Sequence, residues 1–161
     1  MPDAWSVAQV RRAISAYPLS GPVLDVGAGE YSSWFRPLFH EAGLTYIALD
    51  RDQCAGIDIH ADVLSYRSSG WGSILCLSVA EHAERPKRII DRCRVLLRRG
   101  GHFLFAAPIC WERHDFPSDY WRILPDGARL MLSRMELLEL VTENGDDFTM
   151  RNQLFAVARK R

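Results

Sequence analysis

The hydrophobic positions of the chain follow two periods, and each period predicts one kind of element. Four segments place apolar residues three and four positions apart, as on one face of a helix: 6–17, 32–42, 84–97 and 125–134. Seven short runs are apolar enough to form strands: 23–26, 46–49, 57–59, 74–79, 103–107, 135–142 and 153–158. Helices and strands therefore alternate through most of the chain.

Turn and cap residues mark the ends of several of these elements. Ser6-Val-Ala-Gln9 matches a capping box at the start of the first helix, and Pro18 ends that helix. Pro37 predicts a kink or a late start in the second helix, because proline lacks the N–H that a helix interior needs. Gly100-Gly101 follows the end of the third helix.

The alternation predicts an α/β fold, a Rossmann-like, doubly wound and mostly parallel sheet in a three-layer sandwich. The last two strands are joined only by the turn-rich segment 143–147, which is too short for a crossover between parallel strands. We therefore expect an antiparallel last strand. Because the chain has no repeat, low-complexity tract or linker, residues 1–161 are expected to form one domain.

Charge and composition exclude several classes of protein. The 161 residues carry 20 Lys and Arg against 20 Asp and Glu, so the whole chain has no net attraction to nucleic acid or to a membrane surface. The longest apolar run, 103–111, is far shorter than the ~20 residues of a membrane span. The N-terminus lacks a signal-peptide layout. Four cysteines without a C-x-x-C pair indicate reduced thiols in a cytoplasmic protein.

Candidate binding residues follow the predicted strands, where ligands bind in open α/β sheets. Gly27 and Gly29 permit a sharp turn and a close approach to a ligand. Asp50 stands where a carboxylate can accept hydrogen bonds from both hydroxyls of a ribose. Ser32 replaces the third glycine of a dinucleotide motif, which favours an adenosine-type ligand without a pyrophosphate. The alternatives are structural: the glycines serve only the turn, and Asp50 is a solvated strand end or a helix cap.

These segments resemble the motifs of the class I S-adenosylmethionine-dependent methyltransferases over residues 22–132. Val-Leu-Asp25-Val-Gly27-Ala-Gly29 is similar to the first motif of that family, and Tyr-Ile-Ala-Leu-Asp50 to its ribose-binding strand end. Ile-His-Ala-Asp62-Val63 resembles the segment that faces the adenine.

Two later stretches extend the resemblance. Leu-Ser-Val-Ala-Glu81-His82, followed by Arg-Val-Leu-Leu-Arg-Arg-Gly100-Gly101, is similar to the fourth strand, helix and glycine turn of the family. Ala-Pro108, then the segment 114–122 and then Pro-Asp-Gly resemble a subgroup, the type 11-like methyltransferases of small-molecule or polysaccharide pathways.

The resemblance implies S-adenosyl-L-methionine as the cofactor and a small-molecule acceptor that takes its methyl group by in-line displacement. It also implies an N-terminal helix within 1–20, a cofactor-binding half over 22–110, and a substrate loop with the terminal strand pair over 111–161. The implied cofactor residues lie at the strand ends: Asp25, Gly27, Ala28, Gly29, Asp50, Arg51, Asp62, Val63, Ser78 and Val79.

Catalysis and acceptor binding are expected around the loop after the fifth strand. His114, beside Asp115, is the candidate general base, because imidazole titrates near neutral pH. The alternative is that His114 only bonds the loop backbone. The candidate substrate residues are His82, Tyr120, Trp121 and Arg122. Their alternative roles are a helix cap for His82, loop core for the two aromatic residues, and an ion pair with Asp119 for Arg122.

Departures from the family pattern motivate a competing hypothesis, a catalytically inactive binding or partner module. Tyr31 replaces a glycine of the first motif, and Gly72-Ser73 replaces an acidic residue. Only six residues separate Asp50 from Ile57, too few for the usual helix. An NAD-dependent oxidoreductase and an RNA methyltransferase are further alternatives. The RNA alternative depends only on the basic helix 84–99, which is more typical of a solvated surface helix.

Metal and macromolecular partners are not expected. His102, His114, Asp115 and Asp119 are of ligand types, but none has a familiar ligand spacing. A small-molecule methyl acceptor is the expected partner, nucleic acid and membranes are not, and a homo-oligomer is compatible with the sequence.

Overall fold

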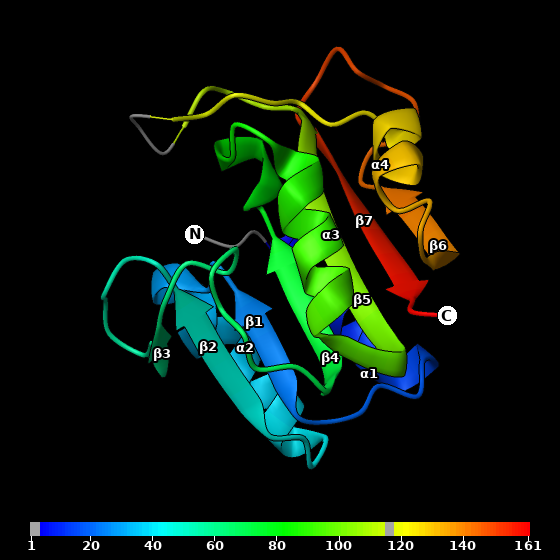
Figure 1. Cartoon of the computed structure of the whole chain (residues 1–161). Coiled ribbons are helices and arrows are strands. Elements are labelled where there is room, and N and C mark those ends of the chain that lie inside the picture. Colours follow the sequence, from blue (N-terminus) through cyan, green and yellow to red (C-terminus); the bar gives the residue numbers. More distant parts are fainter. Residues whose placement is uncertain (1–3, 115–117) are drawn as a thin grey trace.

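The computed structural model describes residues 4–114 and 118–161, and within them seven strands form one sheet in the order β3-β2-β1-β4-β5-β7-β6 (Figure 1). The strands are β1 (Val23–Val26), β2 (Tyr46–Asp50), β3 (Ile59–His60), β4 (Trp71–Leu77), β5 (Leu97–Cys110), β6 (Glu136–Thr142) and β7 (Asn152–Arg159). The helices are α1 (Ala4–Ala16), α2 (Ser32–Glu41), α3 (Pro86–Leu96) and α4 (Pro125–Met131), with 3-10 turns η1 (Gly29–Tyr31) and η2 (Ala80–His82).

The strand directions confirm the predicted fold class. Strands β1 to β5 pair in parallel, whereas β7 runs antiparallel to both β5 and β6. Figure 1 shows α3 in front of the sheet and α1 and α2 behind it, which gives three layers. The chain order reverses between β1 and β4, so these two strands flank the switch point where open α/β sheets bind ligands.

Alternating residues of the central strands build a hydrophobic core on each face of the sheet. Along β5, Phe103 and Phe105 pack toward α3 and α4, while Leu104 and Ala106 pack toward α1 and α2. All four side chains are fully buried, and each phenylalanine contributes roughly 2–3 kcal/mol through burial. Because both faces are covered, the central strands are continuous apolar runs in the sequence.

Several predicted boundaries differ from the structure, most of all those of β5, which was expected over 103–107 and extends from Leu97 to Cys110. Helix α1 begins at Ala4, so Ser6 lies inside it and the capping-box prediction is wrong. Strand β4 begins three residues earlier than expected, because Trp71 and Ser73 pair with β5. Helix α2 begins at Ser32 and continues past Pro37, so the predicted late start is also wrong.

Loops, not helices, join the strands at the β3 edge. Residues 51–58 connect β2 to β3 and residues 61–70 connect β3 to β4; both segments are described throughout, and neither contains a helix. The guanidinium of Arg92 on α3 holds the second loop by donating to the carbonyl oxygens of Val63 and Tyr66. The absence of a helix after Asp50, expected from the short spacing, is confirmed.

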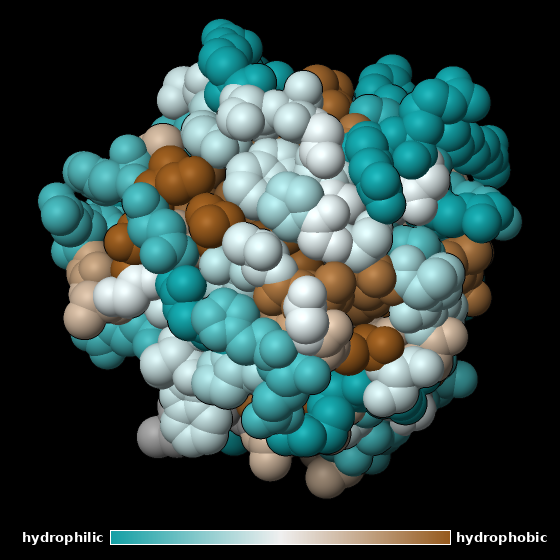
Figure 2. All heavy atoms as spheres, turned by 90° about the horizontal axis from the view of Figure 1, so that it is seen from below, coloured by the Kyte–Doolittle hydropathy of each residue, from teal (hydrophilic) through white to brown (hydrophobic). Residues whose placement is uncertain are grey.

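The end of the molecule where the parallel strands begin has a mixed surface. Figure 2 shows hydrophobic residues there in small groups between hydrophilic ones, whereas interaction surfaces usually form wider apolar patches. None of the helices in the described part of the chain combines the length and the apolar character needed to cross a lipid bilayer.

Candidate functional site

A cavity of about 250 Å³ lies at the carboxyl ends of β1 and β4. Five residues predicted for the site line it: Asp25, Gly27, Ala28, Ser78 and His114. The other lining residues come from α1, η1, α2, η2 and the ends of β4, β5 and β7, and include Ser6, Tyr31, Phe35, Glu81, Trp111, Arg151 and Gln153. The structure therefore joins the first glycine motif and the loop after β5 in one cavity.

The turn after β1 requires both of its glycines. Gly27 and Gly29 have φ angles of +69° and +51°, in the left-handed region that side chains disfavour. A Cβ on Gly27 would also lie 2.5 Å from Cγ2 of Val79, so the turn packs directly on the segment after β4. The backbone N–H groups of Gly27 and Ala28 donate to the carbonyl oxygen of Leu49 at 2.8 and 3.2 Å, which ties the turn to β2.

Asp25 is a buried carboxyl group at the cavity wall. It is 3% exposed and accepts a hydrogen bond from the hydroxyl of Tyr46. The pKa of Asp25 is raised to about 7, chiefly because the group is buried; the hydrogen bond from Tyr46 opposes the shift and the nearby charge of Asp50 adds to it. The charge of this group therefore changes near neutral pH.

Asp50 joins the loops at the ends of β1 and β2. Its Oδ2 accepts a hydrogen bond from the Gly29 N–H at 2.9 Å, and its Oδ1 accepts one from the Asp52 N–H at 2.9 Å. Because Gly29 is the first residue of η1, Asp50 caps the start of that turn, as the helix-cap alternative expected. Arg51, the neighbouring predicted residue, is exposed, and its Nε lies 3.5 Å from Oδ2 of Asp52.

The residues predicted for the adenine edge lie outside the cavity lining. Oδ1 of Asp62 accepts from the N–H of Leu64 at 2.8 Å, which closes a turn in the loop after β3. Val63 is 6% exposed and belongs to the core between the sheet and α3. Asp62 has a local structural role and Val63 a packing role in this geometry, so their contact with an adenine stays a prediction.

The segment after β4 approaches the turn after β1 closely. Ser78 has a φ angle of +54°, a position that non-glycine residues rarely adopt, and its N–H donates to the carbonyl oxygen of Ala106 at 3.0 Å. Val79 fills the space beside Gly27. Strain of this kind is common at ligand sites, which is consistent with the role predicted for Ser78.

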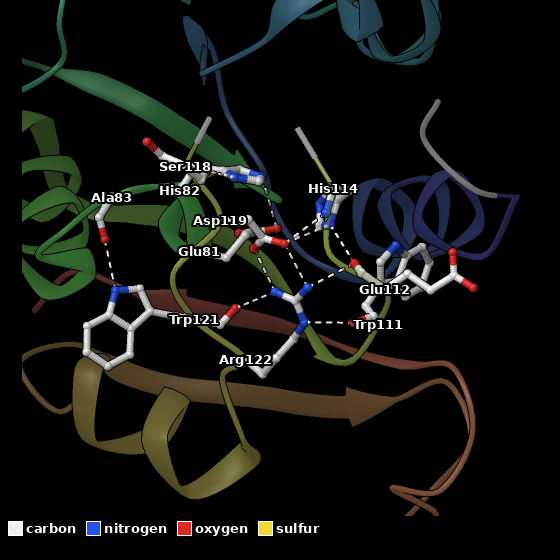
Figure 3. A network of polar contacts seen from close by, with 10 residues as sticks. All are labelled: Glu81, His82, Ala83, Trp111, Glu112, His114, Ser118, Asp119, Trp121 and Arg122. Carbon is white, nitrogen blue, oxygen red and sulfur yellow. Dashed lines mark hydrogen bonds and ion pairs between the residues drawn. The ribbon is translucent and has the colours of Figure 1, made fainter. Parts of the chain in front are cut away.

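His82 and His114 face each other near the cavity, with ring centroids 5.0 Å apart in an edge-to-face arrangement (Figure 3). Nδ1 of His82 lies 2.7 Å from the carbonyl oxygen of Ser118, and Nδ1 of His114 lies 3.0 Å from that of Glu112. His82 is part of η2 and precedes α3, so it does not cap that helix. Asp115, predicted to act beside His114, lies outside the described residues.

In the loop after β5, Arg122 forms the ion pair with Asp119 that was the alternative to its predicted substrate role. Its Nη1 and Nη2 donate to both carboxylate oxygens of Asp119, at 2.6 and 2.8 Å. Its remaining N–H groups donate to the carbonyl oxygens of Trp111, Trp121 and Glu112. A guanidinium has five N–H donors, so none is left for a substrate anion. These bonds hold the pKa of Asp119 well below its usual range.

Tyr120 and Trp121 lie at the surface and not in a loop core. They are 51% and 43% exposed, and neither lines the cavity. The indole N–H of Trp121 donates to the carbonyl oxygen of Ala83 at 3.0 Å, and the backbone N–H groups of both residues donate to that of Glu81. They attach the loop after β5 to η2 and its flanking residue Ala83, and acceptor binding by their rings stays a prediction.

Sequence reasoning missed Glu81, Trp111 and Arg151 as site residues. Glu81 is fully buried and directly precedes His82 in the sequence. Its position next to a predicted site residue could have marked it as a candidate. Arg151 places its guanidinium 3.5 Å from the ring centroid of Trp111, a contact between two segments far apart in the sequence. No local motif predicts such a pair.

Comparisons with known proteins agree with the fold. No protein-family model matches the sequence, and no curated protein matches it. The 1,6-didemethyltoxoflavin-N1-methyltransferase of Burkholderia thailandensis, solved with 1,6-didemethyltoxoflavin and S-adenosylhomocysteine, superposes with a TM-score of 0.74 at 17% identity, covering 98% of this chain and 81% of that one.

Two further structures have similar scores. The (4+2)-cyclase SpnF has a TM-score of 0.73 at 12% identity, covering 96% of this chain and 80% of its own. A candidate methyltransferase of Bacillus halodurans C-125 has a TM-score of 0.71 at 14% identity, covering 98% and 99%. The chain has the class I S-adenosylmethionine-dependent methyltransferase fold. Because SpnF is a cyclase, the fold by itself does not fix the reaction.

Proposed function

We propose that the protein is an S-adenosylmethionine-dependent methyltransferase that acts on a small-molecule acceptor. One observation carries the proposal: the cavity at the switch point is lined by the glycine turn after β1 on one side and by Trp111 and His114 on the other. The B. thailandensis enzyme, which shares the fold, was solved with S-adenosylhomocysteine and its substrate, which supports both ligand classes.

The cofactor, when bound, would supply an electrophilic methyl group on a sulfonium. In the proposed arrangement the turn at Gly27 and Gly29 holds the methionine end, and Asp50 accepts from the ribose hydroxyls. The hydrogen bond from Nδ1 of His114 to Glu112 leaves Nε2 as the basic atom, which can take a proton from an acceptor hydroxyl. Phe35 and Trp111 line the cavity with apolar surface, which favours a desolvated reaction site.

The experiment has two stages. Calorimetric titration with S-adenosylhomocysteine, and with NAD in parallel, tests the cofactor. Incubation with methyl-labelled S-adenosylmethionine and a panel of hydroxylated, amino and sugar-derived small molecules then tests transfer. Binding of S-adenosylhomocysteine but not NAD, followed by label transfer, supports the proposal. Absence of heat with both S-adenosyl compounds contradicts it.

The second candidate is a ligand-binding module that retains the fold without catalysis. The loops 51–58 and 61–70 favour it, because they replace helix with irregular backbone at the β3 edge. Cofactor binding without transfer to any acceptor would favour this candidate over the enzyme.

An RNA methyltransferase has weaker support. Two arginines of the basic segment 84–99, on which the RNA alternative depends, form hydrogen bonds within the protein. Arg92 donates to the loop after β3, and Arg98 donates to the hydroxyl of Ser20 at 2.8 Å. We therefore keep a small molecule as the proposed acceptor.

A further inference from the structure

Three side chains of metal-ligating type meet beside the cavity. Glu81 and His82 belong to η2 after β4, and His114 belongs to the loop after β5. One ligand atom of each lies within 4.8 Å of the others. Figure 3 shows the two imidazole rings on either side of the carboxylates of Glu81 and Asp119. Spacing along the sequence could not reveal this group, because the fold alone brings His114 to Glu81.

Backbone carbonyl groups fix the tautomer of both histidines. A carbonyl oxygen only accepts hydrogen bonds, so Nδ1 of His82 donates to Ser118, and Nδ1 of His114 donates to Glu112. In the neutral ring each Nε2 then carries the lone pair. Metal-binding histidines usually have this arrangement, in which the second ring nitrogen is oriented by a carbonyl or a carboxylate.

The electrostatics of the group favour a cation. Nε2 of His82 lies 3.9 Å from Oε1 of Glu81, whose side chain is fully buried. In this tautomer Nε2 of His82 and the carboxylate oxygen of Glu81 are both electron-pair donors, so a cation placed between them is attracted by both atoms. Two ligand atoms of a tetrahedral zinc site lie roughly 3.4 Å apart for bonds of about 2.1 Å, so side-chain movements of about an ångström would close the site.

We propose that Glu81, His82 and His114 bind one divalent transition-metal ion of the Zn²⁺ type. Two imidazoles and one carboxylate form a ligand set that suits zinc and leaves a coordination position open, whereas Mg²⁺ and Ca²⁺ prefer oxygen ligands alone. Glu81 and His114 both line the cavity, so the open position faces it. Asp119 supports His114 by accepting from its backbone N–H at 3.0 Å.

The ion would change how the proposed reaction uses His114. With the ion bound, His114 would be a ligand and no longer the base, and an acceptor hydroxyl in the open position would give up its proton to solvent water more easily. This consequence rests on the proposed function, but metal binding itself does not, and it is measured without cofactor or acceptor.

The test uses the full chain freed of metal by dialysis against a chelator. Calorimetry with Zn²⁺ measures stoichiometry and affinity, and Co²⁺ reports the ligand geometry through its visible absorption. We expect one ion per chain, with His82→Ala and His114→Ala each weakening binding by at least ~30-fold, since even residues that merely support metal ligands change affinity about 10–100-fold. His40→Ala is the matched control, because His40 lies exposed on α2 and should leave binding unchanged.

Two results would overturn the proposal: no binding of either ion by the wild-type chain, or equal binding by wild type and the His82→Ala/His114→Ala double variant. Circular dichroism of each variant separates loss of a ligand from loss of the fold. His114 is partly exposed, so His114→Ala is the variant expected to remain folded. Titration of the same variants with S-adenosylhomocysteine separates failure of the metal site from failure of the proposed function.

Discussion

The backbone N–H of Gly29 donates to Oδ2 of Asp50 at 2.9 Å, and this bond joins the turn after β1 to the end of β2. The Asp52 N–H holds the other carboxylate oxygen. A carboxylate accepts about four hydrogen bonds, so Asp50 is oriented by the backbone and retains capacity for two more. The same side chain therefore has a structural role, and its two remaining acceptor positions are those that the proposed ribose contact would use.

Asp50→Ala should lower the affinity for S-adenosylhomocysteine by about 100-fold or more. The variant loses two charged acceptor sites for the ribose, each worth about 1.5–3 kcal/mol. Asp50→Asn should lose less affinity than Asp50→Ala, because its amide oxygen can still accept a hydrogen bond from the Gly29 N–H. Calorimetry measures both, with Asp52→Ala as the control, since that side chain is exposed. Unchanged affinity in Asp50→Ala would remove Asp50 from the cofactor site.

Gly27→Ala should destabilise the protein more than Gly29→Ala. Both positions have positive φ angles, so each substitution costs about 1 kcal/mol in backbone strain. At Gly27 the new Cβ also meets Val79 at 2.5 Å, whereas at Gly29 the nearest described atom is Oδ2 of Asp50 at 4.0 Å. The clash adds roughly 1–3 kcal/mol.

Urea unfolding of the two variants checks this order. A Gly27→Ala/Val79→Ala double variant provides the control, because removing the valine methyls opens space for the new Cβ and should recover part of the loss. Equal stability of the two single variants would show that close packing on Val79 does not constrain the turn.

The sequence predicted the fold and five of the fourteen described residues that line the cavity, four of which lie at the ends of β1 and β4, because those features are local. The turn at Gly27 and Gly29 follows directly from a buried strand, and the alternation of elements determines the sheet. The rest of the cavity depends on the path that the loop after β5 takes back to the carboxyl ends of the strands. That path brings His114 to Glu81 and gives Arg122 five hydrogen-bond acceptors. No sequence pattern predicts either of these contacts. The start of β4 was misplaced for the same reason, since the partner of Trp71 is Leu97 of β5.

Arg122→Lys should destabilise the protein by about 2–3 kcal/mol. A lysine has three donors and no planar fork, so it cannot reproduce the paired bonds to Asp119 together with three backbone bonds. Asp119 is 1% exposed, and it would lose most of its partners. Denaturant unfolding measures the change, with Arg129→Lys on the exposed side of α4 as the control. Full stability of Arg122→Lys would return Arg122 to the list of substrate candidates.

Asp25 should make the stability of the fold fall as the pH rises. Burial raises the pKa of this carboxyl from its ordinary 3.8 to about 7 in the folded chain. Between these values the folded state holds a proton that the unfolded state has released, so raising the pH favours unfolding. The contribution of Asp25 is fully present below pH 4, decreases up to pH 7 and is constant above it. A shift of this size corresponds to on the order of 4 kcal/mol.

Asp25→Asn isolates this contribution. The amide oxygen of the asparagine can still accept a hydrogen bond from Tyr46, but the side chain does not ionise. The free energy of unfolding, measured in urea at pH 5, 6, 7 and 8, should fall less steeply for Asp25→Asn than for wild type up to pH 7, and in parallel with it above. Asp146→Asn, at an exposed position, should follow the wild-type curve. Parallel curves for wild type and Asp25→Asn from pH 5 to 7 would mean that Asp25 is ionised throughout, with Tyr46 donating to a carboxylate.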